Sequence, residues 1–503
     1  MPITDDRKLN DAMARAIPAS VLKAISALES AGFEAWAVGG CVRDVMLGKD
    51  PHDWDLTTSA TPAQMKKAMP FKSFDTGIQH GTVTFLVDGE PIETTVYRTE
   101  GVYSDGRHPD SIEFASTLEE DLSRRDFTMN AMAWSPTRGL ADPYGGADDL
   151  DRGELKCVRN ANERFDEDGL RVMRALRFAS VYGLTIEEKT ARAIHAKKGN
   201  LENVSAERIQ TELSKMLAAP DGKHLASTMD EFCDVVFEFA PELEVMYGYD
   251  QANKHHDSDL WHHSLDTMAN VENDPDLRLA ALVHDIGKPE CRSIDEDGQA
   301  HYLGHMKAGK NITENMMRRL KYPNSSIDDV AFLVSVHDER PAARAKSARR
   351  FLAKCGSEEK ARRLLKLMNA DASAHDPQTA ETACSTLRDF EQLMNTEIEK
   401  SAAFSMKDMD FSGNDLIAMG WKPGREMGTE LARLFEKVVD GDVPNSKKAL
   451  ITEVQEHARA KAESGARVYW TPETQDQIWV EGYVRSDGVK VRGHWRHRSK
   501  KQC

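Results

Sequence analysis

Two glycines and two aspartates, closely spaced near the start of the chain, are the first residues that could support chemistry. The segment AWAVGGCVRDVMLGKDPHDWDL (35–56) places Gly39 and Gly40 after an apolar run, with Asp53 and Asp55 following. Glycines between a strand and a helix let backbone amides approach a phosphate closely. Carboxylates at alternate positions of a strand share one face and can bind Mg²⁺ together. The pattern predicts a phosphate-binding turn beside a metal site. Taken alone, the glycine pair also fits an ordinary tight turn, and the two aspartates also fit a chance spacing of acidic residues.

A third acid, Glu93 in PIETTVYR, lies on a later β-like segment. We expect it to be an extra metal ligand or an orienting base, and a solvent-facing strand acid is the equally simple alternative. Two Mg²⁺ ions held by such carboxylates suit in-line nucleotidyl transfer, because one activates the attacking hydroxyl and the other neutralises the leaving pyrophosphate.

The segment LSRRDFTMNAMA (122–133) contains an arginine pair, Arg124 and Arg125. Guanidinium groups offer forked donors for triphosphate oxygens. Asp126 and Asn130 can hydrogen-bond a ribose or orient these arginines. We expect the pair to bind a triphosphate together with the glycine turn and Arg43, and we also assign Arg98 and Arg174 to nucleotide binding.

Base selection is suggested by EDGLRVMRALRF, in which Asp168 and Arg171 are three positions apart. On a helix this spacing puts both side chains on one face. An acceptor beside a donor complements the edge of cytosine and of adenine, whereas uracil and guanine present a carbonyl and a ring N–H there. The alternative is an ordinary salt bridge along a helix.

Histidines and aspartates recur in the second half of the chain, in LWHHSL, LVHDIGKPE, LGHMKAG, VSVHDERP and LMNADASAHD. The vicinal pair His284 and Asp285 can reach one metal only at a bend or a helix end, and the Gly287-Lys-Pro289 sequence that follows supplies such a break. Imidazole with carboxylate suits a divalent transition metal or Mn²⁺/Mg²⁺ better than Ca²⁺.

In their order along the chain, VGGCVRD…DWDL, RRDFTMNA and EDGLR resemble the motifs of class II tRNA nucleotidyltransferases, the CCA-adding enzymes and their bacterial poly(A) polymerase relatives. The resemblance implies Mg²⁺ on Asp53 and Asp55 and selection of CTP and ATP by Asp168 and Arg171. It also implies template-independent addition of CCA to tRNA 3′ ends, with release of pyrophosphate. The segment 97–109 resembles the flexible loop of full CCA-adding enzymes, and VSAERIQTEL (204–213) resembles a neck motif in which Glu207 and Arg208 brace the nucleotide-reading helix.

The histidine–aspartate series resembles the HD phosphohydrolase superfamily. The resemblance implies a basic ligand set of His263, His284, Asp285 and Asp371, with His305 and His337 completing a second metal position. His263 is preferred to His262 on the spacing of that family, and Asp338 is a weaker alternative to Asp371. We expect an additional phosphatase or cyclic phosphodiesterase activity.

The β-like runs between residues 31 and about 150 and the helical periodicity from about Glu163 onward predict an α+β fold. The resemblance implies a polymerase β-like nucleotidyltransferase head with a mixed sheet and helices, followed by an all-α neck, body and tail and a small β-like appendix. The boundaries expected are an N-terminal helical segment 1–30, a head 31–150, a neck 151–220 with the nucleotide-selecting helix, an HD body 221–400, a tRNA-binding tail 401–465 and a basic appendix 466–503. Glycines and a proline within 409–451 suggest two helices joined by a turn, for RNA contact or for packing on the body.

Composition limits the class of protein. The 503 residues are 40% hydrophobic, without the run of about 18 apolar residues that a transmembrane helix needs. The N-terminus does not look secretory, and seven scattered cysteines fit a reducing cytoplasm. A net charge of −17 argues against unspecific nucleic-acid binding over the whole surface. Composition therefore predicts a cytoplasmic protein with no membrane contact, and the family resemblance implies an enzyme whose partners are tRNA, CTP and ATP; the oligomeric state stays open.

Three alternatives remain open at this point. A poly(A) polymerase shares the head motifs, and a partial enzyme adds only CC or only A. A protein of a different class acts chiefly as an HD phosphohydrolase, with its head used for RNA binding.

Overall fold

The computed structural model describes residues 3, 6–100, 112–251, 259–296, 299–400 and 405–463, together with short strands between 477 and 497. The chain forms two compact units, Met1–Ser335 and Val336–Cys503, here called the first and the second unit. Their boundary falls inside the segment 221–400, so the domain limits expected from the sequence remain predictions. Among the described residues, no helix is both long and apolar enough to span a bilayer.

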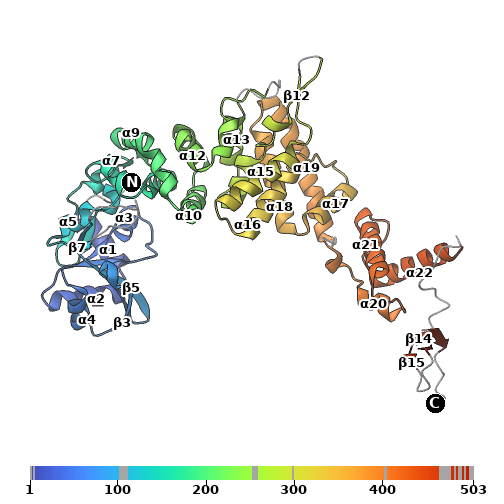
Figure 1. Ribbon diagram of the computed structural model, residues 1–503, viewed down its shortest axis with the longest axis horizontal. Coiled ribbons are helices and arrows are strands. Elements are labelled where there is room, and N and C mark those ends of the chain that lie inside the picture. Colours follow the sequence, from blue (N-terminus) through green and yellow to red (C-terminus); the bar gives the residue numbers. More distant parts are fainter. Residues whose placement is uncertain are drawn as a thin grey trace. The chain divides into compact units, whose positions relative to one another are not determined.

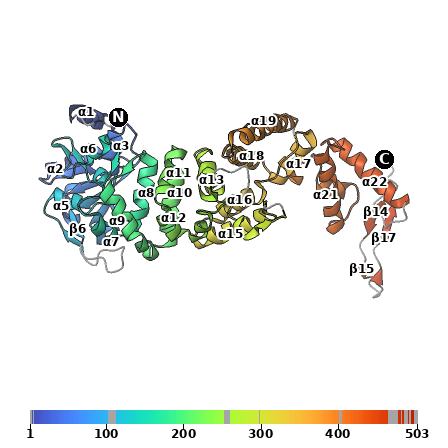
Figure 2. The same ribbon diagram turned by 90° about the horizontal axis from the view of Figure 1, so that it is seen from above.

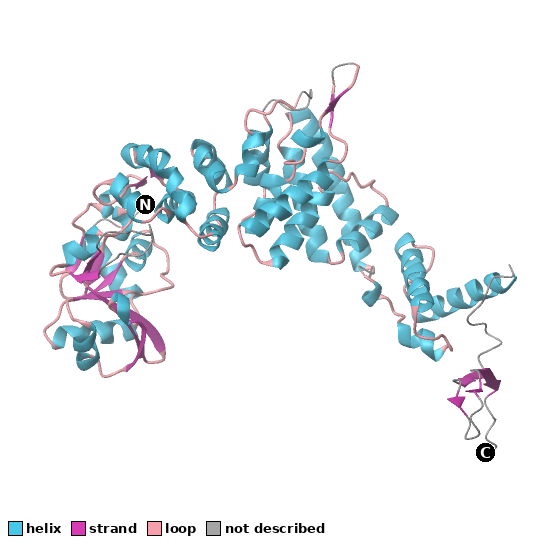
Figure 3. Cartoon of the chain, in the orientation of Figure 1, coloured by secondary structure: helices cyan, strands magenta, loops and turns pink. Residues whose placement is uncertain are grey.

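A mixed seven-stranded sheet forms the head of the first unit and is the large group of strands at the left of Figure 3. The β2–β5 pair is parallel and the other neighbours are antiparallel. A mixed sheet with helices is the fold class expected from the sequence. In spatial order the strands are β3 (Lys72–Gly77), β4 (Thr82–Val87), β5 (Glu90–Val96), β2 (Leu56–Thr58), β1 (Ala35–Val38), β8 (Ala133–Ser135) and β9 (Gly139–Ala141).

One face of this sheet is buried because apolar residues alternate along its strands. On β4, Val83, Phe85 and Val87 are buried and the residues between them are partly exposed. Helices α2 (Ala19–Ser30) and α4 (Pro62–Ala68) pack against the sheet on this side. Helix α1 (Asp6–Ala16) contacts β9 and α3 (Gly40–Met46) (Figure 1).

Helices predominate after the sheet, as the apolar periodicity predicts. Helices α10 and α11 both pack against α8 (Figure 2). The short pairs β6 (Arg98–Glu100)/β7 (Ile112–Phe114) and β10 (Glu154–Leu155)/β11 (Thr185–Ile186) accompany them. The helices are α5 (Leu118–Ser123), α6 (Gly146–Asp151), α7 (Ala161–Glu167), α8 (Leu170–Tyr182), α9 (Glu188–Lys197), α10 (Ala206–Leu217), α11 (Gly222–Glu231) and α12 (Cys233–Phe239).

The segment of the body that belongs to the first unit is also helical, with a hairpin of β12 (Ser293–Ile294) and β13 (Ala300–His301) that the sequence did not predict. Its helices are α13 (Leu260–Ala269), α14 (Pro275–Val283), α15 (His305–Arg319) and α16 (Asn324–Val336), the last of which ends at the unit boundary.

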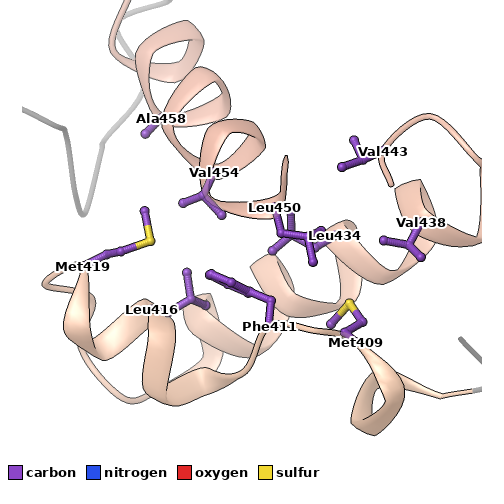
Figure 4. Packing of buried hydrophobic residues seen from close by; sticks show 10 residues of the cluster. All are labelled: Met409, Phe411, Leu416, Met419, Leu434, Val438, Val443, Leu450, Val454 and Ala458. Carbon is purple, nitrogen blue, oxygen red and sulfur yellow. The ribbon is translucent and has the colours of Figure 1, made fainter. Parts of the chain in front are cut away.

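The second unit contains α17 (Ala345–Cys355), α18 (Glu358–Ser373), α19 (Pro377–Glu399), α20 (Gly413–Ala418), α21 (Arg425–Asp440) and α22 (Lys447–Glu463). The last three helices enclose a core of their own, in which Phe411, Leu434 and Leu450 meet (Figure 4). Three helices therefore occupy the segment for which the sequence suggested two. The appendix is β-like as expected: β14 (Gln477–Val480) pairs with β17 (His494–His497), and β15 (Tyr483–Val484) with β16 (Lys490–Val491).

Candidate active site

The three carboxylates expected to bind metal come from adjacent strands of the head sheet. Asp53 and Asp55 precede β2, and Glu93 lies on β5. Leu56 pairs with Thr94 in the parallel register of β2 and β5, which sets Asp55 beside Glu93 on the opposite, exposed face. The fold thus brings together residues about forty positions apart in the chain.

The prediction that Asp53 and Asp55 lie within a strand is wrong in detail. Both occupy an extended segment just before β2, in which the Asp55 carbonyl accepts a hydrogen bond from Val38 N–H at 3.0 Å. That bond belongs to the β1–β2 ladder, so the segment keeps strand-like alternation without being part of the strand.

The acids share one electrostatic environment. Desolvation raises the pKa of Asp55; the Arg125 guanidinium opposes this, while the Glu93 and Asp53 carboxylates add to it. Several oxygen ligands in mutual repulsion are the donor set that a hard divalent cation stabilises. The three residues therefore fit Mg²⁺.

The glycine turn lies against the arginine pair. Gly39 has φ +80°, a conformation that favours glycine, and begins the seven-residue helix α3. A Cβ at Gly39 would approach Arg125 Nη1 to 2.6 Å, so any larger residue would displace the guanidinium. The strand, turn and helix expected here are confirmed, and the turn's glycine makes room for an arginine.

Asp121 orients both arginines, and the sequence analysis missed it. It is fully buried, its Oδ1 accepts hydrogen bonds from Arg124 Nε at 3.1 Å and Nη2 at 2.9 Å, and Arg125 Nη2 lies 4.0 Å from its Oδ2. Burial acts to raise the pKa of Asp121, but the coulombic effect of Arg124 and Arg125 outweighs it and the net shift is downward. Its position three and four residues before the pair, in LEEDLSRR, is the signal that could have identified it.

A buried chain of polar side chains links α3 to α8. Arg43, 7% exposed, donates to Asn130 Oδ1 at 2.6 Å, and Asn130 Nδ2 donates to Asp126 Oδ1 at 3.0 Å. Asp126 Oδ2 in turn accepts from Arg174 Nε at 2.8 Å. Burial opposes ionisation of Asp126, but Arg174 and Asn130 lower its pKa well below the ordinary range. The side chains of Asp126 and Asn130 thus bond Arg174 and Arg43, which are not the arginine pair that they were expected to orient, and the ribose alternative stays a prediction.

The expectation that Asp168 and Arg171 share one helix face is wrong. Helix α7 ends at Glu167, Asp168 is extended (φ −143°), and α8 begins at Leu170. Between them Gly169 packs so closely on Asn200 that a Cβ would lie 2.5 Å from its carbonyl oxygen. The interruption lies at Asp168, because Gly169 is helical (φ −55°, ψ −25°) and directly precedes α8.

Each member of this pair has a different partner. Asp168 Oδ2 accepts from Arg208 Nη2 at 2.7 Å, so Arg208 braces the segment as its neck motif implied. Arg171, 9% exposed, forms an ion pair with Glu167 and donates to the Arg124 carbonyl at 3.0 Å. Arg171 thereby joins the segment 167–171 to the arginine pair.

Arg98, at the start of β6, donates to the His80 carbonyl, and its backbone N–H donates to Asp121 at 3.3 Å. Most of the loop expected over 97–109 lies outside the described residues.

The first unit also contains a buried cluster of metal-ligand residue types. Ligand atoms of His263, His284 and Asp285 lie within 4.8 Å of one another. His305 Nε2 is 3.6 Å from Asp285 Oδ1, and Lys288 Nζ is 2.6 Å from Asp285 Oδ2. Helix α14 ends at Val283, so the vicinal pair lies at a helix end as expected, although the helix ends before the pair and not at the Gly287-Lys-Pro289 sequence after it. Buried imidazoles around a carboxylate fit a divalent transition metal.

Burial favours His263 over His262 as the candidate metal ligand. His263 is fully buried, whereas the His262 side chain is 45% exposed and lies between Asp259 and Asp230. In the second unit, His337 and Asp371 are buried, and Asp338 is 41% exposed in its side chain and paired with Arg340.

His375 is a further metal-ligand type that the sequence analysis did not select. It follows Asp371 by one helical turn, and its Nδ1 lies 3.9 Å from Asp371 Oδ1. The i, i+4 spacing in DASAH was its signal.

Three family models match the chain. The model described as the poly A polymerase head domain matches residues 35–156, and the probable RNA and SrmB-binding site of polymerase A matches 183–244. The putative tRNA nucleotidyltransferase domain 2 matches 296–454.

The most similar curated proteins include CCA-adding enzymes. The enzyme of Lactobacillus helveticus is 32% identical over 451 residues, which cover 88% of this chain and 97% of that enzyme. The enzyme of Lactiplantibacillus plantarum is 48% identical over 193 residues, and that match spans 38% of this chain and about half, 47%, of the relative.

Solved structures show the same fold. The Bacillus stearothermophilus CCA-adding enzyme in complex with CTP has a TM-score of 0.64 and 26% identity, covering 89% of this chain and 100% of that one. The Thermotoga maritima CCA-adding enzyme complexed with tRNA has a TM-score of 0.55 at 19% identity, covering 90% and 98%.

Proposed function

Because this chain belongs to the family of CCA-adding enzymes and is a nucleotidyltransferase, we propose that it adds C, C and A in turn to the 3′ end of tRNA from CTP and ATP. The observation that carries the proposal is the convergence of Asp53, Asp55 and Glu93 on the exposed face of the sheet, at its central strands β2 and β5. The arginine pair of the same motif set lies beside it.

In the proposed reaction, the tRNA 3′-hydroxyl oxygen forms a bond to the α-phosphorus of the nucleotide. The bond between the α-phosphorus and the oxygen that bridges it to the β-phosphate breaks, and pyrophosphate leaves with that electron pair. Mg²⁺ on Asp53 and Asp55 would supply Lewis-acid activation and charge neutralisation. Glu93 completes the set as a ligand or as the base that orients the hydroxyl, while Arg124 and Arg125, fixed by Asp121, donate to triphosphate oxygens.

Base selection is assigned to Asp168 and Arg171. A carboxylate offers about four acceptor positions. The hydrogen bonds from Arg208 and from Leu170 N–H leave Asp168 able to accept an exocyclic amine as well. We propose that Arg208 positions this acceptor and that Glu167 positions Arg171 as donor.

The test offers the purified chain a tRNA lacking CCA, first with each nucleoside triphosphate alone and then with CTP plus ATP. Three added nucleotides ending in A support the proposal. A long A tail would overturn it in favour of polyadenylation, and products that stop at CC, or that add only A to a tRNA ending in CC, would identify a partial enzyme. A cytoplasmic location is part of the same proposal.

A second candidate activity rests on the buried cluster of His263, His284, Asp285 and His305. We propose that it binds a divalent transition metal, or Mn²⁺/Mg²⁺, and supports phosphatase or cyclic phosphodiesterase activity. His337 and Asp371 stay predictions as further ligands. Metal content and hydrolysis of p-nitrophenyl phosphate and of a 2′,3′-cyclic nucleotide test this, with His284→Ala as the variant that must lose both.

A further inference from the structure

The exposed face of the head sheet continues beyond the carboxylates toward its edge strand. Thr84 on β4 is the register partner of Glu93, and Phe74 on β3 is the register partner of Thr84. Register partners point to the same face of a sheet. Asp55, Glu93, Thr84 and Phe74 therefore form one row across four strands, on the face opposite the buried core.

The far end of this row carries an aromatic ring and a cation. Phe74 is 41% exposed, and Lys72, two positions earlier on the same strand, places Nζ 5.2 Å from the centroid of its ring. Asp75 points to the other side, where it pairs with Lys66 of α4 at 2.6 Å. Asp75, the acid that follows Phe74 in the chain, is thus paired with Lys66, and the ring of Phe74 has the positive charge of Lys72 beside it.

We propose that Phe74 and Lys72 form a platform for the 3′ strand of the tRNA, on which a base stacks on the ring while the ammonium binds a neighbouring phosphate. The inference rests on the proposed function. Strands lie about 4.8 Å apart, so three steps place Phe74 roughly 14 Å from Asp55. A polynucleotide whose last hydroxyl lies at the carboxylates must extend away from them, and this row is a continuous exposed path. Aromatic rings and cations together are the chemistry that binds single-stranded nucleic acid without reading its sequence.

The experiment measures steady-state addition to a tRNA lacking CCA by the full chain. Phe74→Leu should raise KM for tRNA about tenfold, leave KM for CTP within about twofold, and change kcat little. Phe74→Trp should restore the wild-type KM, because it keeps the stacking surface that Leu lacks.

Lys72→Ala should also raise KM for tRNA and should reduce the salt dependence of tRNA binding by about one phosphate contact. Lys67→Ala is the matched control, since Lys67 is an exposed lysine on α4, which packs on the covered side of the sheet. It should leave KM unchanged.

The proposal fails if Phe74→Leu and Lys72→Ala bind and extend tRNA like the wild type, or if their KM rises for CTP rather than for tRNA. Titration of each variant with tRNA lacking CCA measures binding directly. It therefore distinguishes failure of the platform from failure of the proposed nucleotide addition. A wild type that adds nothing yet binds tRNA through Phe74 would overturn the activity and support the platform.

Discussion

The head and the body of the first unit each gather residues that suit divalent metals, but they do so at opposite degrees of burial. In the head, Asp53, Asp55 and Glu93 are exposed, whereas in the body His263 and His284 are fully buried and Asp285 is 3% exposed. An open set of oxygen ligands can admit a polynucleotide and a triphosphate. A closed set of nitrogen and oxygen ligands admits only an ion and a small substrate. We therefore expect a substitution in one site to leave the activity of the other site unchanged.

The largest expected effect separates the two sites by activity. Asp55→Ala should lower nucleotide addition by about 10³-fold or more, because a metal ligand supplies several kcal/mol of transition-state stabilisation. His284→Ala should leave addition within about twofold. Incorporation of labelled CTP into tRNA lacking CCA measures both, and comparable losses in the two variants would mean that the sites are coupled.

The second effect concerns stability in the head network. Asp126→Asn should lower the free energy of unfolding by about 1–2 kcal/mol, because it replaces the charge-assisted hydrogen bonds between buried Asp126 and the partly exposed Arg174 with a neutral one. Urea unfolding at pH 7 measures this value.

The pH dependence of Asp126→Asn has a definite sign. Since the folded-state pKa of Asp126 is depressed, its stabilisation is present above its unfolded value of about 3.9 and is lost as the pH falls below it. The stability difference between wild type and Asp126→Asn should therefore shrink below about pH 4. A difference that is constant with pH would assign the loss to packing alone.

A smaller effect is expected on fidelity. Arg208→Ala removes the ion pair that positions Asp168, and we expect discrimination against UTP to fall about tenfold. Competition between CTP and UTP measures the ratio of kcat/KM values, and Arg208→Lys should retain part of it. If discrimination is unchanged while stability falls, Arg208 is only structural.

The smallest expected effect is a metal-dependent change in thermal stability at the buried site. Mn²⁺ or Co²⁺ should raise the Tm of the wild type by a few degrees, since a ligand that binds only the folded state stabilises it. His284→Ala should lose this shift, and Asp55→Ala should keep it. A shift that follows Asp55 instead would place the stabilising metal in the head.

The mixed sheet was implied by the resemblance to a known family. From local residue types and periodicity, the sequence predicted the glycine turn, the helical neck and the position of the vicinal His284 and Asp285 at a helix end. It misplaced the helix that was to carry both Asp168 and Arg171: the backbone is extended at Asp168, whose side chain pairs with Arg208, forty positions away. It also missed Asp121, whose function depends on both arginines converging on one buried carboxylate.

The sequence by itself therefore determined which chemical groups this protein carries and in what order. Only the tertiary structure decided their partners: Asp126 meets Arg174 across 48 positions, and Arg208 meets Asp168 across 40. Strand register set Glu93 beside Asp55 and Phe74 at the end of the same row. The physical reason is that periodicity reports which face of an element is buried, whereas the neighbour on that face is chosen by packing between distant segments.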